Sequence, residues 1–278
     1  MSGKLYFCPT PIGNLGDITL RVLEVLRAAD LVVAEDTRHT RKLLSHFDIH
    51  KPLLSCHEHN EAERVDEILE RVASGQTIAV VSDAGMPGIS DPGSLLAKAA
   101  IERGLPWTVL PGPSAVLTAL VLSGLSTQQF LFLGFPPRQK KERQPWLEKL
   151  KALPYTLIFY EAPHRLSAFL TDLRATLGCR QAALVREISK QFEEVERGDL
   201  GQLAAIYESK VPRGEFVVVV DGAATEIQSN VPSLEEAIAA VKRLVGEGLE
   251  PSRAIKEVAQ LLGIPRRTLY NSYHQEGQ

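Results

Sequence analysis

The chain has 278 residues, 44% of them hydrophobic and 23% charged, a composition typical of a globular protein with one large or two modest domains. Its formal net charge of −3 excludes nucleic-acid binding by the surface as a whole, so any such binding must depend on local basic patches. Three distant cysteines without a CxxC pair argue against a disulfide scaffold or a zinc ribbon, and with no signal-peptide pattern and no bilayer-length apolar run we expect a cytoplasmic protein without membrane contact.

The first half of the chain alternates strand-like and helix-like segments. Apolar runs predict strands at 5–8, 31–34, 78–81 and 107–110. Helical spacing predicts helices at 17–29, which Asp17 would cap, and at 61–73 and 94–103. This repeated order of strand, loop and helix predicts a parallel sheet covered by helices on both faces. We place this first α/β lobe at residues 1–127.

The second half begins where the composition changes near Gly134. Further strands are expected at 156–160, 182–186, 192–196 and 215–220, with helices at 163–177 and 200–209. These segments predict a second α/β lobe over residues 128–222, followed by a polar linker over residues 223–232.

The remaining residues, 233–278, have only helical patterns. Ser233 is expected to cap a helix that ends at Val245, with Glu236 placed for a capping box. Further helices are expected at 251–262 and 266–274, with Gly263 in the turn between them. This arrangement is typical of a helix-turn-helix, and it is equally consistent with a helical oligomerisation or lid domain.

Four loops rich in glycine and proline follow the strands of the first lobe. They cover residues 9–15, 35–40, 82–93 and 111–115. Parallel strands end at the same edge of a sheet, so these loops should meet there, where open α/β sheets bind ligands. The longest lacks both the GxGxxG pattern and the lysine of a phosphate-binding loop, which argues against a dinucleotide or a nucleoside triphosphate. The alternative is that all four are ordinary βα turns.

The polar string Glu35-Asp36-Thr37-Arg38-His39 stands at one of these strand ends. Carboxylates beside an arginine and a histidine could orient a hydroxyl group or accept its proton. The alternative is that Asp36 caps a helix and the others are surface charges. A metal site in Cys56-His57-Glu58-His59-Asn60 is disfavoured, because the spacing is not HExxH and no cysteine pair completes a tetrahedral site.

Residues 138–151 contain six basic and two acidic residues around Trp146. Such a segment could follow a phosphate backbone, or it could be the solvated face of a helix. Arg266 and Arg267 open the last predicted helix, although six basic residues balance six acidic ones from residue 233 onward.

Four motifs together resemble the tetrapyrrole-methylase superfamily, and within it the branch that methylates small-subunit ribosomal RNA. They are Pro9-Thr10-Pro11-Ile12-Gly13-Asn14-Leu15, Ala34-Glu35-Asp36-Thr37-Arg38, Ser82-Asp83-Ala84-Gly85-Met86-Pro87 and Leu110-Pro111-Gly112-Pro113-Ser114-Ala115. The resemblance covers essentially the whole chain. Met86 is a departure, because the family pattern leads us to expect threonine there.

The resemblance implies a two-lobed α/β fold, that of the class III methyltransferases, with a small C-terminal helical domain and with S-adenosylmethionine bound between the lobes. It implies a homodimer that methylates the ribose 2′-hydroxyl of a cytidine in the decoding region of 16S rRNA in the small ribosomal subunit. The cofactor contacts it implies are Pro11, Asp83, Gly85, Pro87, Gly88, Ile89, Ser90, Gly112, Ser114, Ala115, Tyr160, Ala162, Glu187 and Gly214.

The hypothesis for catalysis is that Glu35 or Asp36 accepts the hydroxyl proton while Arg38 and His39 orient the RNA. The expected RNA contacts are Arg138, Lys140, Lys141, Arg143, Arg165, Arg266 and Arg267. Three alternatives stay open: a tetrapyrrole C-methyltransferase, a protein-modifying methyltransferase acting on a translation factor, and a DNA-binding regulator that senses S-adenosylmethionine. The first would not need the basic segment or the helical tail, and relatives of the second kind lack this tail.

Overall fold

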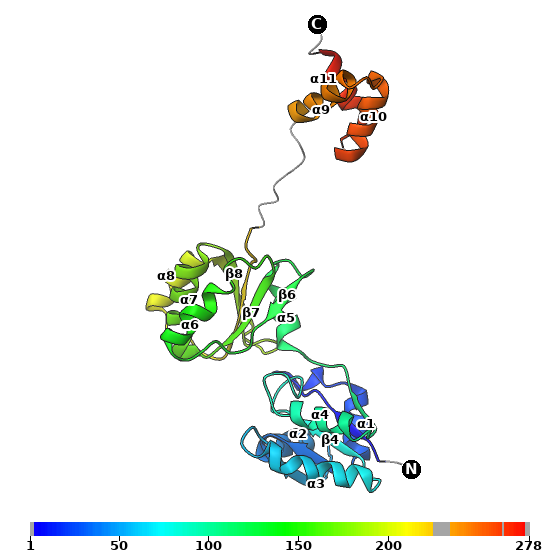
Figure 1. Cartoon of the computed structure of the whole chain (residues 1–278). Helices are drawn as coiled ribbons and strands as arrows, with labels where there is room; N and C mark the ends of the chain where they lie inside the picture. The colour runs from blue at the N-terminus through cyan, green and yellow to red at the C-terminus, as the bar shows by residue number, and fades with distance from the viewer. Residues whose placement is uncertain (1–2, 225–233, 263, 276–278) are drawn as a thin grey trace. The chain divides into compact units, whose positions relative to one another are not determined.

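The computed structural model describes residues 3–224, 234–262 and 264–275 (Figure 1). Its first sheet is entirely parallel, with the strand order β3-β2-β4-β1-β5. The strands are β1 Leu5–Phe7, β2 Leu31–Ala34, β3 Leu53–Ser55, β4 Ile78–Val81 and β5 Trp107–Val109. The parallel sheet predicted from the sequence is therefore confirmed, while the short edge strand β3 was not predicted.

Helices cover both faces of this sheet, as the alternating pattern predicted. They are the 3-10 turn η1 Leu15–Asp17, α1 Leu20–Ala28, α2 Thr37–His46, α3 Glu61–Ala73 and α4 Ser94–Glu102. One core cluster joins the sheet to α3 and α4, and a second joins its other face to α1 and α2. The cap predicted for α1 was wrong: Asp17 lies in η1, and the Thr19 hydroxyl accepts the backbone N–H of Val22 at 3.2 Å.

The second sheet is mixed, with the order β6-β7-β10-β8-β9. The strands are β6 Phe130–Phe132, β7 Thr156–Glu161, β8 Gln181–Arg186, β9 Glu194–Asp199 and β10 Phe216–Val220. Only β6 and β7 run parallel; the other neighbours are antiparallel. β9 begins two residues later than predicted, because its pairing with β8 runs from Glu194 to Asp199, and β6 was not predicted.

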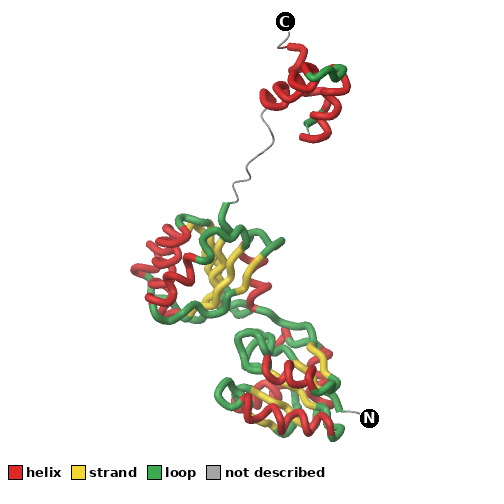
Figure 2. The backbone as a smooth tube through the Cα atoms, in the orientation of Figure 1, coloured by secondary structure: helices red, strands yellow, loops and turns green. Residues whose placement is uncertain are grey.

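Three helices pack on one face of the second sheet and one helix packs on the other (Figure 2). The three are α6 Lys140–Glu148, α7 Pro163–Leu177 and α8 Leu200–Ser209. The fourth is α5 Ala115–Ser123, which contacts β8, β9 and β10. Sequence analysis assigned α5 to the first lobe, but its buried side chains join the core of the second sheet.

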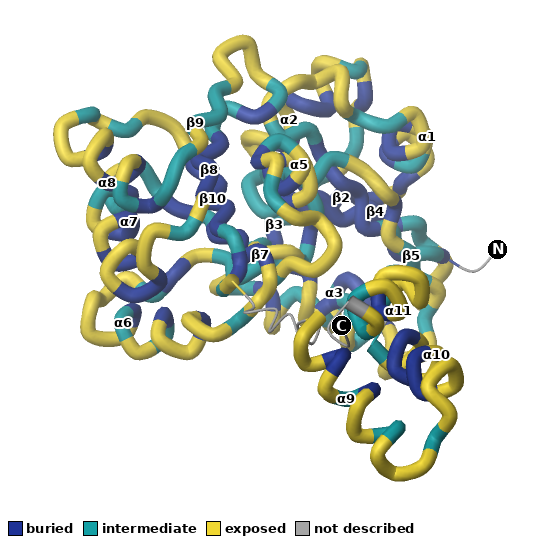
Figure 3. The backbone as a smooth tube through the Cα atoms, turned by 90° about the horizontal axis from the view of Figure 1, so that it is seen from above, coloured by how far each residue is buried: buried dark blue, intermediate teal, exposed yellow. Residues whose placement is uncertain are grey.

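The chain divides into two compact units between Ala223 and Ala224. The second unit contains α9 Leu234–Gly246, α10 Pro251–Leu262 and α11 Arg266–Gln275, with a core of its own that includes Ile238, Ile255 and Leu269. Buried and exposed residues alternate along α9 and α10 in Figure 3, as in helices with one buried face. The predicted cap Ser233 and turn residue Gly263 lie outside the described residues. No helix in the described part of the chain is long and apolar enough to cross a membrane.

Candidate functional site

The four predicted loops and the second sheet together line a cavity of about 830 Å³. From the first half of the chain it is lined by Ile12, Glu35, Asp83, Ala84, Gly85, Met86, Ile89, Ser90, Asp91, Pro111, Gly112 and residues 114–117. From the second half it is lined by Phe132, Phe135, Tyr160, Glu161, Glu187, Ile188, Lys190 and residues 214–217. The cavity size is in the range of sites for small molecules and cofactors.

Backbone hydrogen bonds tie the loops of the first half to one another. Thr10 and Gly85 exchange two N–H···O bonds of 2.9 and 3.0 Å, which form an antiparallel bridge between two loops. The Thr10 hydroxyl also donates to the carbonyl of Ser82 at 3.1 Å, and the Asp36 N–H donates to Asp83 Oδ1 at 3.1 Å. Three of the four loops are thus connected before any ligand binds.

A buried carboxylate fixes the far end of the 82–93 loop. Glu61 Oε1 accepts the backbone N–H groups of Gly93, Leu95 and Leu96 at 2.9, 3.1 and 3.3 Å. These are donors at the N-terminus of α4, where a negative charge is stabilised by the helix dipole. Glu61 therefore stabilises the end of the loop and the start of α4.

Several backbone positions around the cavity adopt left-handed conformations. Ser90 and Glu187, both with side chains larger than glycine, have φ of 60° and 52°. Gly214 has φ of 77°, and a Cβ there would lie 2.6 Å from Glu187 Oε1. Non-glycine residues in this region are strained and concentrate at functional sites, which supports a functional role for these loops.

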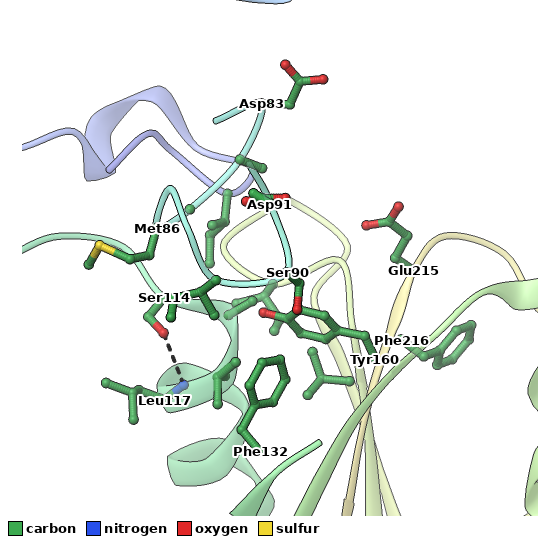
Figure 4. Close-up of a pocket in the computed structure, with 18 of the residues that line it drawn as sticks. Asp83, Met86, Ser90, Asp91, Ser114, Leu117, Phe132, Tyr160, Glu215 and Phe216 are labelled. Carbon is green, nitrogen blue, oxygen red and sulfur yellow. Dashed lines mark hydrogen bonds between the residues drawn. The ribbon is translucent and has the colours of Figure 1, made fainter. Parts of the chain in front are cut away.

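The cavity lining combines carboxylates with apolar side chains. In Figure 4, Asp83, Asp91 and Glu215 lie on the loops, whereas Leu117 and Phe132 lie along α5 and β6. Burial, followed by the nearby charges of Glu35, Asp83 and Glu215, raises the pKa of Asp91 to about 7. Such a lining suits a ligand with an apolar body and a positive charge.

The four residues predicted for catalysis divide into two groups. Glu35 lines the cavity, and burial together with Asp83 raises its pKa above the ordinary value. Asp36 instead caps α2: it accepts the backbone N–H of Arg38 at 2.8 Å and pairs with its guanidinium, which holds the pKa of Asp36 at about 2. His39 lies with Pro11 in a smaller neighbouring hollow. The geometry therefore favours the capping alternative for Asp36 and Arg38.

Most of the predicted cofactor contacts line the cavity. Pro87, Gly88 and Ala162 do not, and Pro11 lines the neighbouring hollow. Sequence reasoning missed Asp91, Glu215, Phe132 and Phe135. Asp91 could have been found, because it stands within the loop that was singled out; Glu215 and the two phenylalanines follow no motif and depend on how the second sheet pairs.

Two of the expected RNA contacts need correction. Arg143 is buried, and its Nε and Nη2 donate to Asp172 Oδ2 at 2.8 and 2.5 Å, so its guanidinium is not available to a partner. Arg165 is paired with Glu161, and its side chain is only 17% exposed. The other expected contacts, Arg138, Lys140, Lys141, Arg266 and Arg267, are exposed.

The cluster around His57 has no metal-binding geometry. Among the described residues no group of three or more histidine, cysteine or acidic side chains is placed to hold a metal ion. Cys56 is buried, which raises its pKa to about 11 and disfavours the thiolate that a metal would need. His57 instead donates its backbone N–H to Asn60 Oδ1 at 2.7 Å, as in a capped turn.

Two protein families match different parts of the chain. Residues 4–204 match the family described as tetrapyrrole (corrin/porphyrin) methylases, and residues 231–275 match the RsmI C-terminal HTH domain. The chain is 44% identical to ribosomal RNA small subunit methyltransferase I of Halalkalibacterium halodurans, covering 99% of this chain and 96% of that protein. It is 42% identical to the protein of that name from Bacillus subtilis, covering 98% and 94%.

Solved structures with low sequence identity have the same fold. A diphthine synthase superposes with a TM-score of 0.61 at 17% identity, covering 79% of this chain and 90% of that one. At this identity the likeness concerns the fold alone, and it agrees with the two-lobed architecture expected from the sequence.

Proposed function

This chain belongs to the tetrapyrrole methylase family and to its ribosomal RNA small subunit methyltransferase I group, and from that premise we propose that it methylates 16S rRNA with S-adenosylmethionine. The proposed target is the ribose 2′-hydroxyl of a cytidine in the decoding region. One observation carries the proposal: the methylase family and the RsmI C-terminal domain both match this one chain. A ribosomal RNA small subunit methyltransferase I also aligns with it over 99% of its length.

The residues of the cavity fit S-adenosylmethionine. When bound, this cofactor supplies a methyl group activated by a positively charged sulfur. Glu35, Asp83, Asp91 and Glu215 make the lining acidic, which favours a cation, and the apolar side includes Leu117 and Phe132. Gly85 and Gly214 have φ of 80° and 77°, which residues with a Cβ rarely adopt, so glycine allows the loops to follow these paths along the cavity.

We assign proton acceptance from the ribose hydroxyl to Glu35. It lines the cavity together with Asp83, and burial followed by the Asp83 charge raises its pKa, which makes it a better base than an ordinary glutamate. As the ribose oxygen takes the methyl group, its proton would move to the Glu35 carboxylate, while the methyl–sulfur bond of the cofactor would break and leave the sulfur as a neutral thioether. Asp91 is the second carboxylate with a suitable pKa, whereas Asp36 is committed to capping α2.

Contacts outside the cavity are proposed to hold the ribosomal RNA. Three exposed basic residues, Arg138, Lys140 and Lys141, follow the cavity residue Phe135 closely in the sequence. Two more, Arg266 and Arg267, are exposed in the second unit. Their charges suit phosphate groups. Because its substrate is ribosomal RNA, we place the protein in the cytoplasm.

We also propose a homodimer. Val121 on α5 is 71% exposed and does not line the cavity, as expected for an apolar side chain that a second copy covers.

Methyl transfer from labelled S-adenosylmethionine to small ribosomal subunits that lack the modification tests the proposed function. Naked 16S rRNA and uroporphyrinogen serve as parallel substrates, and mass spectrometry locates the product. We expect label on one cytidine ribose, and no label when that nucleotide carries deoxyribose, because the 2′-hydroxyl is the acceptor. Label on the tetrapyrrole alone would contradict the proposal and favour a C-methyltransferase.

A further inference from the structure

The segment Gly134–Arg138, at the rim of the cavity, is held through its backbone by two arginines. Arg165 Nη2 donates to the carbonyls of Pro136 and Pro137 at 2.8 and 3.2 Å. Arg143 Nη1 donates to the carbonyls of Pro137 and Arg138 at 3.1 and 3.0 Å. Three successive carbonyl groups are therefore fixed by two side chains from α6 and α7.

Each arginine is itself held by a buried carboxylate. Arg143 pairs with Asp172, and both side chains are buried. Arg165 Nε lies 3.3 Å from Glu161 Oε1, whose side chain is fully buried. A buried charge that loses its partner is strongly destabilising, so these pairs resist rearrangement. The rim segment is consequently held in one arrangement by the two arginines.

This ordered rim keeps a large aromatic side chain half in solvent. Phe135 lines the cavity, yet it is 54% exposed. Its ring centroid lies 5.4 Å from that of Tyr160, which in turn lies 5.0 Å from Phe132. The three rings form a series along the cavity lining that ends at the exposed Phe135.

We propose that Phe135 is a stacking residue for a nucleobase of the RNA substrate, at or next to the nucleotide that is methylated. The inference rests on the proposed function and names a contact that it requires. A ribose inside a base-paired helix can reach a closed site only if its nucleotide leaves the stack. An exposed aromatic ring compensates for the lost stacking, and exposed basic residues nearby, Arg138, Lys140 and Lys141, suit the flanking phosphates.

The test compares Phe135→Leu with a matched control, Phe192→Leu. Phe192 is 72% exposed on another loop and does not line the cavity. Initial rates are measured on small subunits lacking the modification, and cofactor affinity is measured by calorimetry. For Phe135→Leu we expect the KM for subunits to rise by about ten-fold, within the range that one base stack contributes, with Tm unchanged. Because Phe135 lines the cofactor cavity, a fall in cofactor affinity without a rise in this KM would assign the ring to the cofactor and overturn the inference. Phe135→Trp should keep the wild-type KM, and so should Phe192→Leu.

Arg165→Lys tests whether the rim positions the ring. Lysine keeps a charge beside Glu161 but loses the planar fork that reaches two carbonyls. We expect the KM of Arg165→Lys for subunits to rise as well. The double variant with Phe135→Leu should have the same KM as Phe135→Leu alone, because both changes remove the same stacking interaction. A purely structural role of Arg165 would instead lower Tm and add to the effect of Phe135→Leu.

The outcomes separate this inference from the proposed function. If the wild-type protein methylates subunits and Phe135→Leu has the same KM, the stacking role is overturned while the function stands. If Phe135→Leu changes the sedimentation of the protein instead of its KM, the ring belongs to a contact between proteins and the inference is equally overturned. If the wild-type protein methylates neither subunits nor rRNA, the proposed function fails first and the stacking role fails with it.

Discussion

The two sheets contribute to the same cavity by different routes. The first sheet is parallel, so the loops that follow β1, β2, β4 and β5 reach the cavity from one edge. In the second sheet, β10 is antiparallel to β7 and β8, and Phe216 at its start lies opposite both Glu161 and Arg186 at their ends. The second sheet therefore lines the cavity with strand ends and strand starts together. Chain order alone predicts the first kind of lining, whereas the second kind needs the pairing of the strands.

The largest effect is expected from a change in Glu35, which lies in a loop of the first sheet. Glu35→Gln should lower kcat for methyl transfer by about 100-fold or more, because it removes the proposed proton acceptor and keeps its shape. Single-turnover rates on small subunits measure the effect, and calorimetry should give a much smaller loss of cofactor affinity, because three other carboxylates still line the cavity. Asp36→Asn is the matched control: it should act mainly on stability, through the cap of α2. Equal loss in both variants would contradict the assignment.

A change in the second sheet tests whether its loops are as closely fitted. Gly214→Ala places a Cβ 2.6 Å from Glu187 Oε1 at a φ of 77°, so we expect cofactor affinity to fall by about ten-fold. Gly178→Ala is the control, because its φ is 76° and a Cβ there meets nothing within 4 Å. Both variants should lose stability in thermal unfolding, but only Gly214→Ala should lose affinity. Unchanged binding would place Gly214 outside the cofactor site.

A third variant tests how Glu61 stabilises the end of the 82–93 loop. Glu61→Gln removes the charge that accepts three N–H groups at the start of α4, and should cost about 1–2 kcal/mol. Denaturant unfolding measures this cost, and Glu63→Gln, an exposed acid in the first turn of α3, should cost little. The KM for S-adenosylmethionine should rise with Glu61→Gln alone. Two equal costs would mean that Glu61 does no more than an ordinary first-turn charge.

The smallest expected effect concerns Asp91 and pH. Its folded pKa of about 7 is above the ordinary value of 3.8, so the native state binds the proton more tightly than the unfolded state. Stability from this group is complete below about pH 4 and is lost as the pH rises through about 7. Asp91→Asn should therefore stabilise the protein at about pH 8, by roughly 1 kcal/mol after allowing for its partial exposure, and should have little effect at about pH 4. Thermal unfolding at the two pH values measures it, and the same shift at both would contradict it.

Local patterns predicted much of the fold. The helices α7, α8 and α10 begin and end at the residues that the helical patterns predicted. The edge strands β3 and β6 were missed, because three residues give no periodicity and their pairing comes from distant neighbours. The candidate site was also predicted in part. Asp83, Gly85 and Ser114 lie in loops whose motifs the sequence shows, whereas Glu215 and Phe135 line the cavity only because of how the second sheet folds.

The packing of α5 determines where the chain can be split into two fragments that fold. The helix belongs to the first half by sequence, yet Val116, Ala119 and Leu120 are buried against the second sheet. A fragment that ends at residue 127 would carry this helix without the surface that covers it, and the complementary fragment would expose one face of its sheet to water. Division just before Ser114 leaves each fragment with its own helices. Expression of split halves should therefore succeed at that junction and give aggregates at the later one.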